Sequence, residues 1–226
     1  MARYNDLDMN NWKEYDDILT DSLWIFDKRD KSGAHNASYH GNFIPQIPNQ
    51  LFRRYTKKGD WILDPFVGGG TSLIEAQRLS RNAIGIELQE DVAKIAHDLV
   101  KQEKTKDFKG TIIVGDSRVV NIEERLKCFG ISKVQFVIYH PPYWDIIKFS
   151  DNEKDLSNCN TLEEFCQSFG EVIDNTSKYL EKNRYCACVI GDKYANSEIV
   201  PLGFCCMNLF LSRGFKLKAI LVKNFE

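Results

Sequence analysis

The sequence predicts an α/β fold with a doubly wound, mostly parallel sheet. From residue 61 onward, short runs rich in β-branched and aromatic residues alternate with amphipathic helical stretches. A glycine-rich turn at residues 68–70 separates the first of these runs from the helical stretch that follows it. Parallel sheets of this kind bind ligands beyond the carboxyl ends of their strands. We therefore expect the functional residues just after each strand.

The expected elements follow in a regular order. Residues 12–19 and 49–55 have helical spacing, and the charged segment between residues 27 and 38 is expected to be a loop. The predicted strands are 61–64, 83–87, 111–114, 134–139, 185–190 and 216–222. The predicted helices are 71–80, 91–103, 161–181 and 197–212. This alternation indicates right-handed crossover connections throughout.

Composition narrows the possible classes. The 226 residues are 43% hydrophobic and 27% charged, which allows a real core and excludes a disordered chain. No run approaches the roughly 18 apolar residues of a membrane helix, and residues 1–11 do not form a secretion signal. We expect a cytoplasmic protein with seven reduced cysteines. No C-x2-C pair occurs, so no metal is expected.

The turn after the first strand points to a cationic ligand. Asp64 ends the strand, Pro65 and Phe66 follow it, and glycines lead to Thr71. No lysine follows these glycines, so the turn is not a phosphate-binding loop. The Asp64 carboxylate would repel a phosphate but would attract a cationic amino group.

Two more acids end the next two strands. Glu87 can accept hydrogen bonds from both hydroxyls of a ribose, and Asp116, followed by Ser117, can accept one from an adenine amino group. Asp116 could instead serve as a helix N-cap, and Glu87 could be a solvated strand end. Together with Asp64, these acids favour a cationic nucleoside without phosphate. S-adenosylmethionine fits that description.

The fourth strand leads into a rigid turn, His140-Pro141-Pro142-Tyr143. Two prolines fix an extended segment, and both proline carbonyls remain free to accept hydrogen bonds. Tyr143 offers a stacking face for a flat base. An exocyclic amine that is held by acceptors and stacked on an aromatic ring would fit this turn, and its nitrogen would attack a sulfonium methyl group in line.

These two motifs together resemble the amino-group DNA methyltransferases, which modify adenine N6 or cytosine N4. The block 64–71 looks like their cofactor motif, and the turn 140–143 looks like their Asp/Asn/Ser-Pro-Pro-Tyr/Phe catalytic motif. The segment 40–51 looks like the part that closes over the methionine end of the cofactor. The resemblance implies a cytoplasmic, DNA-associated enzyme of a restriction–modification system, with S-adenosylmethionine as cofactor and the target base flipped out of the duplex. We favour adenine N6 slightly over cytosine N4.

The predicted site residues follow from the motifs and the resemblance together. The predicted catalytic residues are His140, Pro141, Pro142 and Tyr143. The predicted cofactor-binding residues are Phe43, Ile44, Pro45, Asp64, Pro65, Phe66, Gly68, Gly70, Thr71, Glu87, Asp116, Ser117 and His140. The predicted DNA-contacting residues are Trp144 and Lys148, which directly follow the turn.

The sequence departs from the family pattern in two ways. Position 140 is His, and only a neutral imidazole can accept a hydrogen bond, so we expect activity to fall below about pH 6.5. The family also implies one more strand, which is antiparallel. We expect residues 1–39 to form an extension and residues 40–226 to form a catalytic domain. A further C-terminal segment, a second subunit or the first 40 residues themselves would supply what this domain lacks. An RNA base amino-methyltransferase and a non-catalytic subunit of a heteromeric enzyme are the alternatives.

Overall fold

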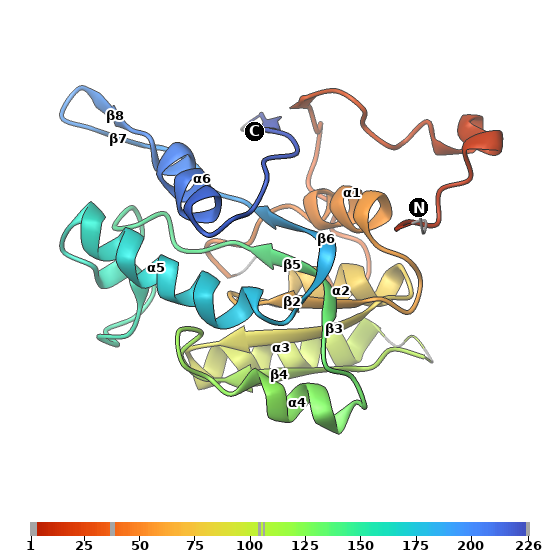
Figure 1. The fold of residues 1–226 in the computed structure, drawn as a ribbon, viewed down its shortest axis with the longest axis horizontal. Helices are drawn as coiled ribbons and strands as arrows, with labels where there is room; N and C mark the ends of the chain where they lie inside the picture. The colour runs from red at the N-terminus through yellow and green to blue at the C-terminus, as the bar shows by residue number, and fades with distance from the viewer. Residues whose placement is uncertain (1–3, 37–38, 104, 106, 225–226) are drawn as a thin grey trace.

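The computed structural model describes residues 4–36, 39–103, 105 and 107–224. Within these residues the central sheet has five strands in the order β4-β3-β2-β5-β6, all parallel to one another (Figure 1). The strands are β2 (Trp61–Asp64), β3 (Asn82–Glu87), β4 (Gly110–Val114), β5 (Val134–Tyr139) and β6 (Leu180–Cys188). The prediction of an α/β fold with a mostly parallel sheet is confirmed.

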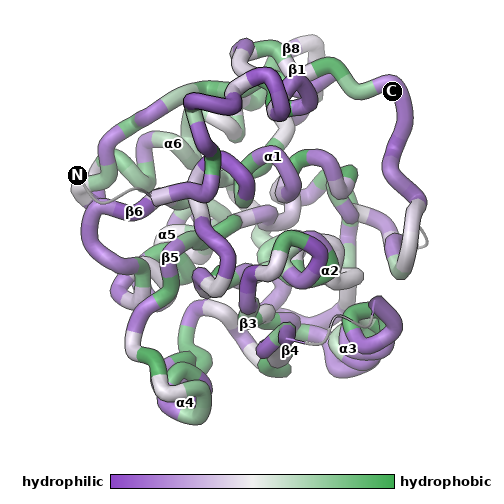
Figure 2. Tube along the Cα trace, turned by 90° about the vertical axis from the view of Figure 1, so that its right-hand side faces the viewer, coloured by the Kyte–Doolittle hydropathy of each residue, from purple (hydrophilic) through white to green (hydrophobic). Residues whose placement is uncertain are grey.

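Helices cover both faces of this sheet. One face carries α1 (Gln46–Tyr55), α2 (Thr71–Arg78) and α3 (Glu90–Glu103), and the other carries α4 (Ile122–Cys128), α5 (Leu162–Ser177) and α6 (Leu202–Ser212). The outer turns of α3 are hydrophilic (Figure 2), while Val92, Ala93 and Ala96 on the same helix are buried. Such one-sided burial is what an amphipathic helix gains by packing on a sheet.

Strand alternation divides the core into two layers. In β5, Phe136 and Ile138 join the cluster under α1 and α2, while Val137 and Tyr139 join the cluster under α5 and α6. All four side chains are fully buried. Because both faces of the strand are covered, β5 is apolar at nearly every position, as expected for a central parallel strand.

The strand order places a topological switch point between β2 and β5. The chain leaves β2 towards β3 and β4 on one side, and it leaves β5 towards β6 on the other side. Connections that diverge in this way open a crevice beyond the carboxyl ends of the two strands. Asp64 is the last residue of β2, and His140 follows the last residue of β5.

The predicted sixth strand, 216–222, is wrong as a part of the central sheet. Only its end forms a strand, β9 (Val222–Lys223), which pairs in parallel with β1 (Leu23–Trp24). Leu217, Ile220 and Val222 are more than half exposed, so this segment lacks the neighbours that a buried strand requires.

Other elements also differ from the prediction. The predicted helix 161–181 ends at Ser177, because β6 already begins at Leu180. The predicted helix 197–212 begins only at Leu202, because a hairpin of β7 (Lys193–Ala195) and β8 (Glu198–Val200) precedes it. Helix α4 was not predicted, although Asn121 caps it by accepting a hydrogen bond from the Glu124 amide. The N-terminal helix is a 3-10 helix, η1 (Met9–Tyr15). In the part of the chain that the structure describes, no helix is long and apolar enough to cross a membrane.

Candidate active site

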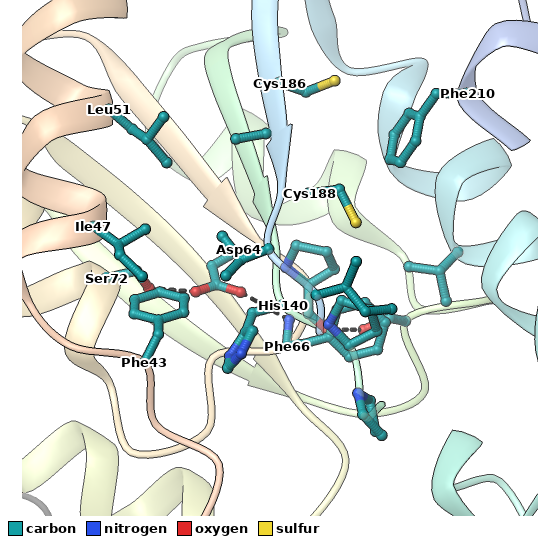
Figure 3. Close-up of a pocket in the computed structure, with 18 of the residues that line it drawn as sticks. Phe43, Ile47, Leu51, Asp64, Phe66, Ser72, His140, Cys186, Cys188 and Phe210 are labelled. Carbon is teal, nitrogen blue, oxygen red and sulfur yellow. Dashed lines mark hydrogen bonds between the residues drawn. The ribbon is translucent and has the colours of Figure 1, made fainter. Parts of the chain in front are cut away.

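A hollow of about 1360 Å³ opens beyond the carboxyl ends of the strands and continues along β6. Figure 3 shows part of its lining, with Asp64 and Phe66 from the end of β2 and His140 from the end of β5 beside Phe43. The predicted site residues that line it are Phe43, Ile44, Asp64, Pro65, Phe66, Gly68, Thr71, Glu87, Asp116, Ser117, His140, Pro141, Pro142 and Tyr143. The structure thus brings together the segments that the sequence singled out.

Asp64 is a buried carboxyl group at the centre of this lining. Its residue is 1% exposed, and it accepts hydrogen bonds from the Ser72 hydroxyl and from the Phe66 amide, the latter at 2.9 Å. Burial raises the pKa of Asp64 to about 7. No lysine, arginine or histidine of the described residues forms an ion pair with it. A cationic group of a ligand would therefore find a carboxylate without a competing charge.

Glu87 joins the end of β3 to the glycine turn. Its two oxygens accept hydrogen bonds from the Gly68 and Gln89 amides, each at 3.0 Å. Burial raises the pKa of Glu87 above its ordinary value. A carboxylate oxygen can accept more than one hydrogen bond, so both oxygens can still accept a ligand hydroxyl.

The glycine turn is covered by a segment that precedes α1. Gly68 and Gly70 have φ values of 48° and 86°, a region that glycine adopts without strain. The Gly69 amide donates to Asn42 Oδ1 at 3.3 Å, and a Cβ on Gly68 would lie 2.9 Å from Tyr39 Cε1. Asn42 lies in segment 40–51, which the family resemblance singled out. No pattern in the sequence pointed to Tyr39.

Asp116 is already engaged within the protein. Its two oxygens lie 3.0 and 3.1 Å from Arg118 Nε, and one of them lies 2.8 Å from Arg118 Nη2. The Ser117 hydroxyl donates to the Pro65 carbonyl at 2.6 Å. Both residues line the hollow, and the Ser117 hydrogen bond ties the segment after β4 to the turn that follows β2.

The turn after β5 presents a neutral histidine. Desolvation lowers the pKa of His140 to about 4, and burial raises the pKa of Tyr143 to about 12. His140 Nε2 lies 3.1 Å from the Tyr143 hydroxyl oxygen, and the Phe43 ring centroid is 4.6 Å from that of His140. Because the imidazole stays neutral below pH 6.5, we expect the fall of activity at a lower pH, where His140 becomes protonated.

Four predicted residues lie outside the hollow lining. Pro45 and Gly70 occupy the N-cap positions of α1 and α2. The Trp144 indole N–H donates to the Cys159 carbonyl at 2.9 Å, so its polar edge is engaged inside the protein. Lys148 is exposed and pairs with Asp151. Its contact with DNA stays a prediction.

One cluster of the described residues has side chains that could hold a metal ion. Ligand atoms of Asp30, His35 and Glu75 lie within 4.8 Å of one another. The Arg78 guanidinium already lies 3.3 Å from a carboxylate oxygen of Asp30 and 3.3 Å from one of Glu75. This arginine supplies the positive charge that the two acids require, so the cluster ties the segment around residue 35 to α2.

Comparison with known proteins agrees with this geometry. Residues 2–98 match the family model of the N6/N4 DNA methylases. This part of the chain is similar to the amino-group DNA methyltransferases. Type II methyltransferase M2.DpnII from Streptococcus pneumoniae is 37% identical over 100 residues, which are 42% of this chain and 34% of that protein. Type II methyltransferase M2.LlaDCHI from Lactococcus lactis subsp. cremoris is 37% identical over 90 residues, which are 39% of this chain and 31% of that protein.

The chain therefore spans about a third of the length of these methyltransferase relatives. Among solved structures, a precorrin 8w decarboxylase from Methanobacterium thermoautotrophicum has a TM-score of 0.54 at 13% identity, with 84% of this chain and 82% of that one covered. This likeness confirms the fold class. Similarity to this family supports S-adenosylmethionine as the cofactor, in agreement with the residues around Asp64 and Glu87. The matched segment ends before the turn at residues 140–143.

Proposed function

We propose that this chain transfers a methyl group from S-adenosylmethionine to an exocyclic amine of a DNA base. Adenine N6 is the preferred target over cytosine N4, and the target base is flipped out of the duplex to reach the turn at residues 140–143. The observation that carries the proposal is that one hollow is lined both by the unpaired carboxyl group of Asp64 and by the neutral imidazole of His140. The relatives named as type II methyltransferases support the same activity.

The cofactor residues divide by the chemistry of the groups they would hold. The Asp64 carboxylate would bind the amino group, and Glu87 would accept the ribose hydroxyls. Gly68 lets the backbone approach closely, while Tyr39 and Asn42 shield that end of the hollow from water. When bound, S-adenosylmethionine supplies an electrophilic methyl group on a sulfonium.

His140 and Tyr143 would hold the target base. A neutral histidine has one donor and one acceptor nitrogen. If Nε2–H donates to the Tyr143 hydroxyl oxygen, the lone pair of Nδ1 is free to accept a hydrogen bond from the exocyclic amine. The opposite tautomer would use up the acceptor on Tyr143. We therefore assign the proton to Nε2, so that Nδ1 accepts from the amine and orients its nitrogen for attack.

Transfer of labelled methyl groups tests the activity. The chain is incubated with labelled S-adenosylmethionine and either unmethylated duplex DNA or unmodified transfer RNA. We expect label in DNA, recovered after hydrolysis as N6-methyladenine. Recovery as N4-methylcytosine would overturn the base preference alone. Label only in RNA, or none in either nucleic acid, would refute the proposed activity and favour an RNA enzyme or a non-catalytic subunit.

We also propose that a further strand completes the sheet beside β6. Within the described residues, β6 is an edge strand, and the hollow continues between it and residues 214–223. Apolar side chains of α1 and α6, among them Leu51 and Phe210, line this space from the two sides. A second subunit or a further segment of the polypeptide would supply the strand, so that residues 40–226 form an incomplete catalytic domain and residues 1–39 an extension.

Hydrogen exchange tests the open edge. Backbone amides of β6 that face β5 should be protected, because they lie within the sheet. The alternate amides of β6 point away from β5, into the space beside the edge strand. In the isolated chain they should exchange at least tenfold faster than the amides that face β5. Equal protection of both sets would contradict an open edge.

A further inference from the structure

The turn after Tyr143 is held by the segment that follows β6. A Cβ on Gly191 would lie 2.9 Å from Tyr143 Cε2, so the backbone at 191 packs directly against that ring. Two residues later, Lys193 Nζ lies 4.3 Å from the ring centroid of Trp144 and 2.5 Å from a carboxylate oxygen of Asp145. Alternate residues of an extended segment face the same side. Gly191 and Lys193 therefore present one face to residues 143–145.

Trp144 has a backbone conformation that its neighbours must hold in place. Its φ value is 51°, in the left-handed region that bulky residues rarely adopt. Such a conformation persists only where the surrounding structure over-determines it. The indole N–H is bound to the Cys159 carbonyl at 2.9 Å, and the face of the ring lies against Lys193. These two contacts fix the ring at its edge and at its face.

Lys193 makes both a cation–π contact with Trp144 and an ion pair with Asp145, and its ammonium group is partly shielded from water. Its side chain is 19% exposed, compared with 43% for Asp145. A partly desolvated ammonium interacts more strongly with an aromatic face and with a carboxylate than a fully exposed one does. Lys193, Trp144 and Asp145 are all absent from the residues that line the hollow. Their contacts therefore act on the turn and not on a ligand.

We propose that Lys193 is a positioning residue that fixes the turn carrying Tyr143 through its contacts with Trp144 and Asp145. This inference rests on the proposed function, in which Tyr143 holds the target base. The hairpin of β7 and β8 that begins with Lys193 extends from the body of the molecule beside α6 (Figure 1). Lys193 connects that hairpin to the turn.

Methyl-transfer kinetics provide the first test. Lys193→Met keeps the length of the side chain but removes its charge, and Lys193→Arg keeps a cation that can stack and pair. A ring misplaced by about 1 Å can cost on the order of a hundredfold in rate. We expect K193M to lower kcat on unmethylated DNA at least tenfold, with the cofactor Kd unchanged within twofold, and K193R to restore most of the rate. Lys127→Met is the matched control, because Lys127 forms an exposed ion pair with Glu123 on α4.

A second measurement does not depend on activity. The indole N–H of Trp144, assigned with a Trp144→Phe variant, should be protected from hydrogen exchange in the unmodified chain because it is bound to Cys159. We expect its protection to fall at least tenfold in K193M, to remain in K127M and to return in K193R. Melting temperature and cofactor affinity are measured for each variant.

The outcomes separate this inference from the proposed function. If the unmodified chain transfers no methyl group to DNA, the proposed activity fails, and the indole exchange alone decides the role of Lys193 in holding the turn. Unchanged kcat or unchanged indole protection in K193M would overturn the inference. So would a loss of cofactor binding or a collapse of the melting temperature in K193M, because either would show a general structural role.

Discussion

His140 Nε2 lies 3.1 Å from the hydroxyl oxygen of Tyr143, and the two rings meet edge to face with their centroids 5.6 Å apart. Both residues belong to one short turn after β5, and the two prolines between them restrict its backbone. The contact leaves one nitrogen of a neutral imidazole for a ligand. It also links the protonation of His140 to the position of the ring that would stack on the base.

The pH dependence of turnover tests the state of His140. Because desolvation lowers the pKa of His140 to about 4, the imidazole is neutral above that value. We expect kcat at saturating cofactor to be constant from pH 5 to pH 8. A decline of kcat centred near pH 6.5 would contradict the shielding of this ring.

Replacement of His140 separates hydrogen-bond acceptance from packing. His140→Asn keeps an acceptor and should retain kcat within about tenfold, whereas His140→Ala removes it and should lower kcat by a hundredfold or more. The measurement is steady-state methyl transfer, with cofactor Kd as the control. Equal activity of the two variants would show that acceptance by residue 140 has no role.

Variants of Tyr143 and Asp64 distinguish binding of the target base from binding of the cofactor, at the two ends of the hollow. Tyr143→Ala removes the stacking face, which contributes roughly 1–3 kcal/mol per base in single-strand binding. We expect turnover to be lost while cofactor Kd, measured by calorimetry, stays within twofold. Asp64→Ala should do the reverse and weaken the cofactor at least tenfold. If Y143A abolished cofactor binding and D64A spared it, the assignment of the two ends would be reversed.

The buried carboxyl group of Asp64 makes binding and stability depend on pH. Burial raises its pKa to about 7, from an ordinary value of 3.8. The protonated form cannot pair with a cation, so cofactor Kd should rise about tenfold for each pH unit below 7. A Kd that is unchanged between pH 7 and pH 5 would argue against a cationic ligand at Asp64.

The Asp64 carboxyl group also makes the free energy of unfolding depend on pH. The direction is opposite to that of a salt-bridged aspartate, which stabilises the folded state at high pH. The folded pKa of Asp64 lies above its unfolded pKa, so its contribution to stability is fully present at low pH and is lost as pH rises through about 4 to 7. The Asp64→Asn variant should lack this dependence of stability on pH. It should be more stable than the original chain at pH 8, by up to roughly 4 kcal/mol. Urea unfolding at pH 5 and pH 8 measures both effects. A stability of the original chain that does not fall between pH 5 and pH 8 would contradict the raised pKa of this carboxyl group.

Gly191 tests the packing behind Tyr143. A methyl group at position 191 would lie 2.9 Å from the Tyr143 ring, so Gly191→Ala must displace that ring. We expect kcat to fall at least tenfold with little change in cofactor Kd. Gly203→Ala is the matched control, since its Cβ would make only an ordinary contact, at 3.4 Å from Asp192 Oδ1. The same loss of rate in both variants would remove the special role of Gly191.

The sequence by itself determined the α/β class and the two motifs, because these depend on local patterns. Alternating apolar runs and helical periods predicted all five strands of the central sheet, and both turns consist of neighbouring residues with restricted backbones. The local sequence pattern gave a wrong prediction where the fold provides no neighbouring strand to pair with. Residues 216–222 contain an apolar, strand-forming run, but only the end of this segment pairs, and it pairs with β1 instead of with the central sheet.

Only the tertiary structure decided which distant residues meet. The order of the strands places β2 beside β5 and so brings Asp64 and His140 to one hollow. It also places Tyr39 on the glycine turn and Lys193 on Trp144, contacts that no spacing in the chain encodes. The raised pKa of Asp64 and the lowered pKa of His140 have the same origin. Desolvation depends on everything packed around a group, and the sequence specifies that packing only through the complete fold.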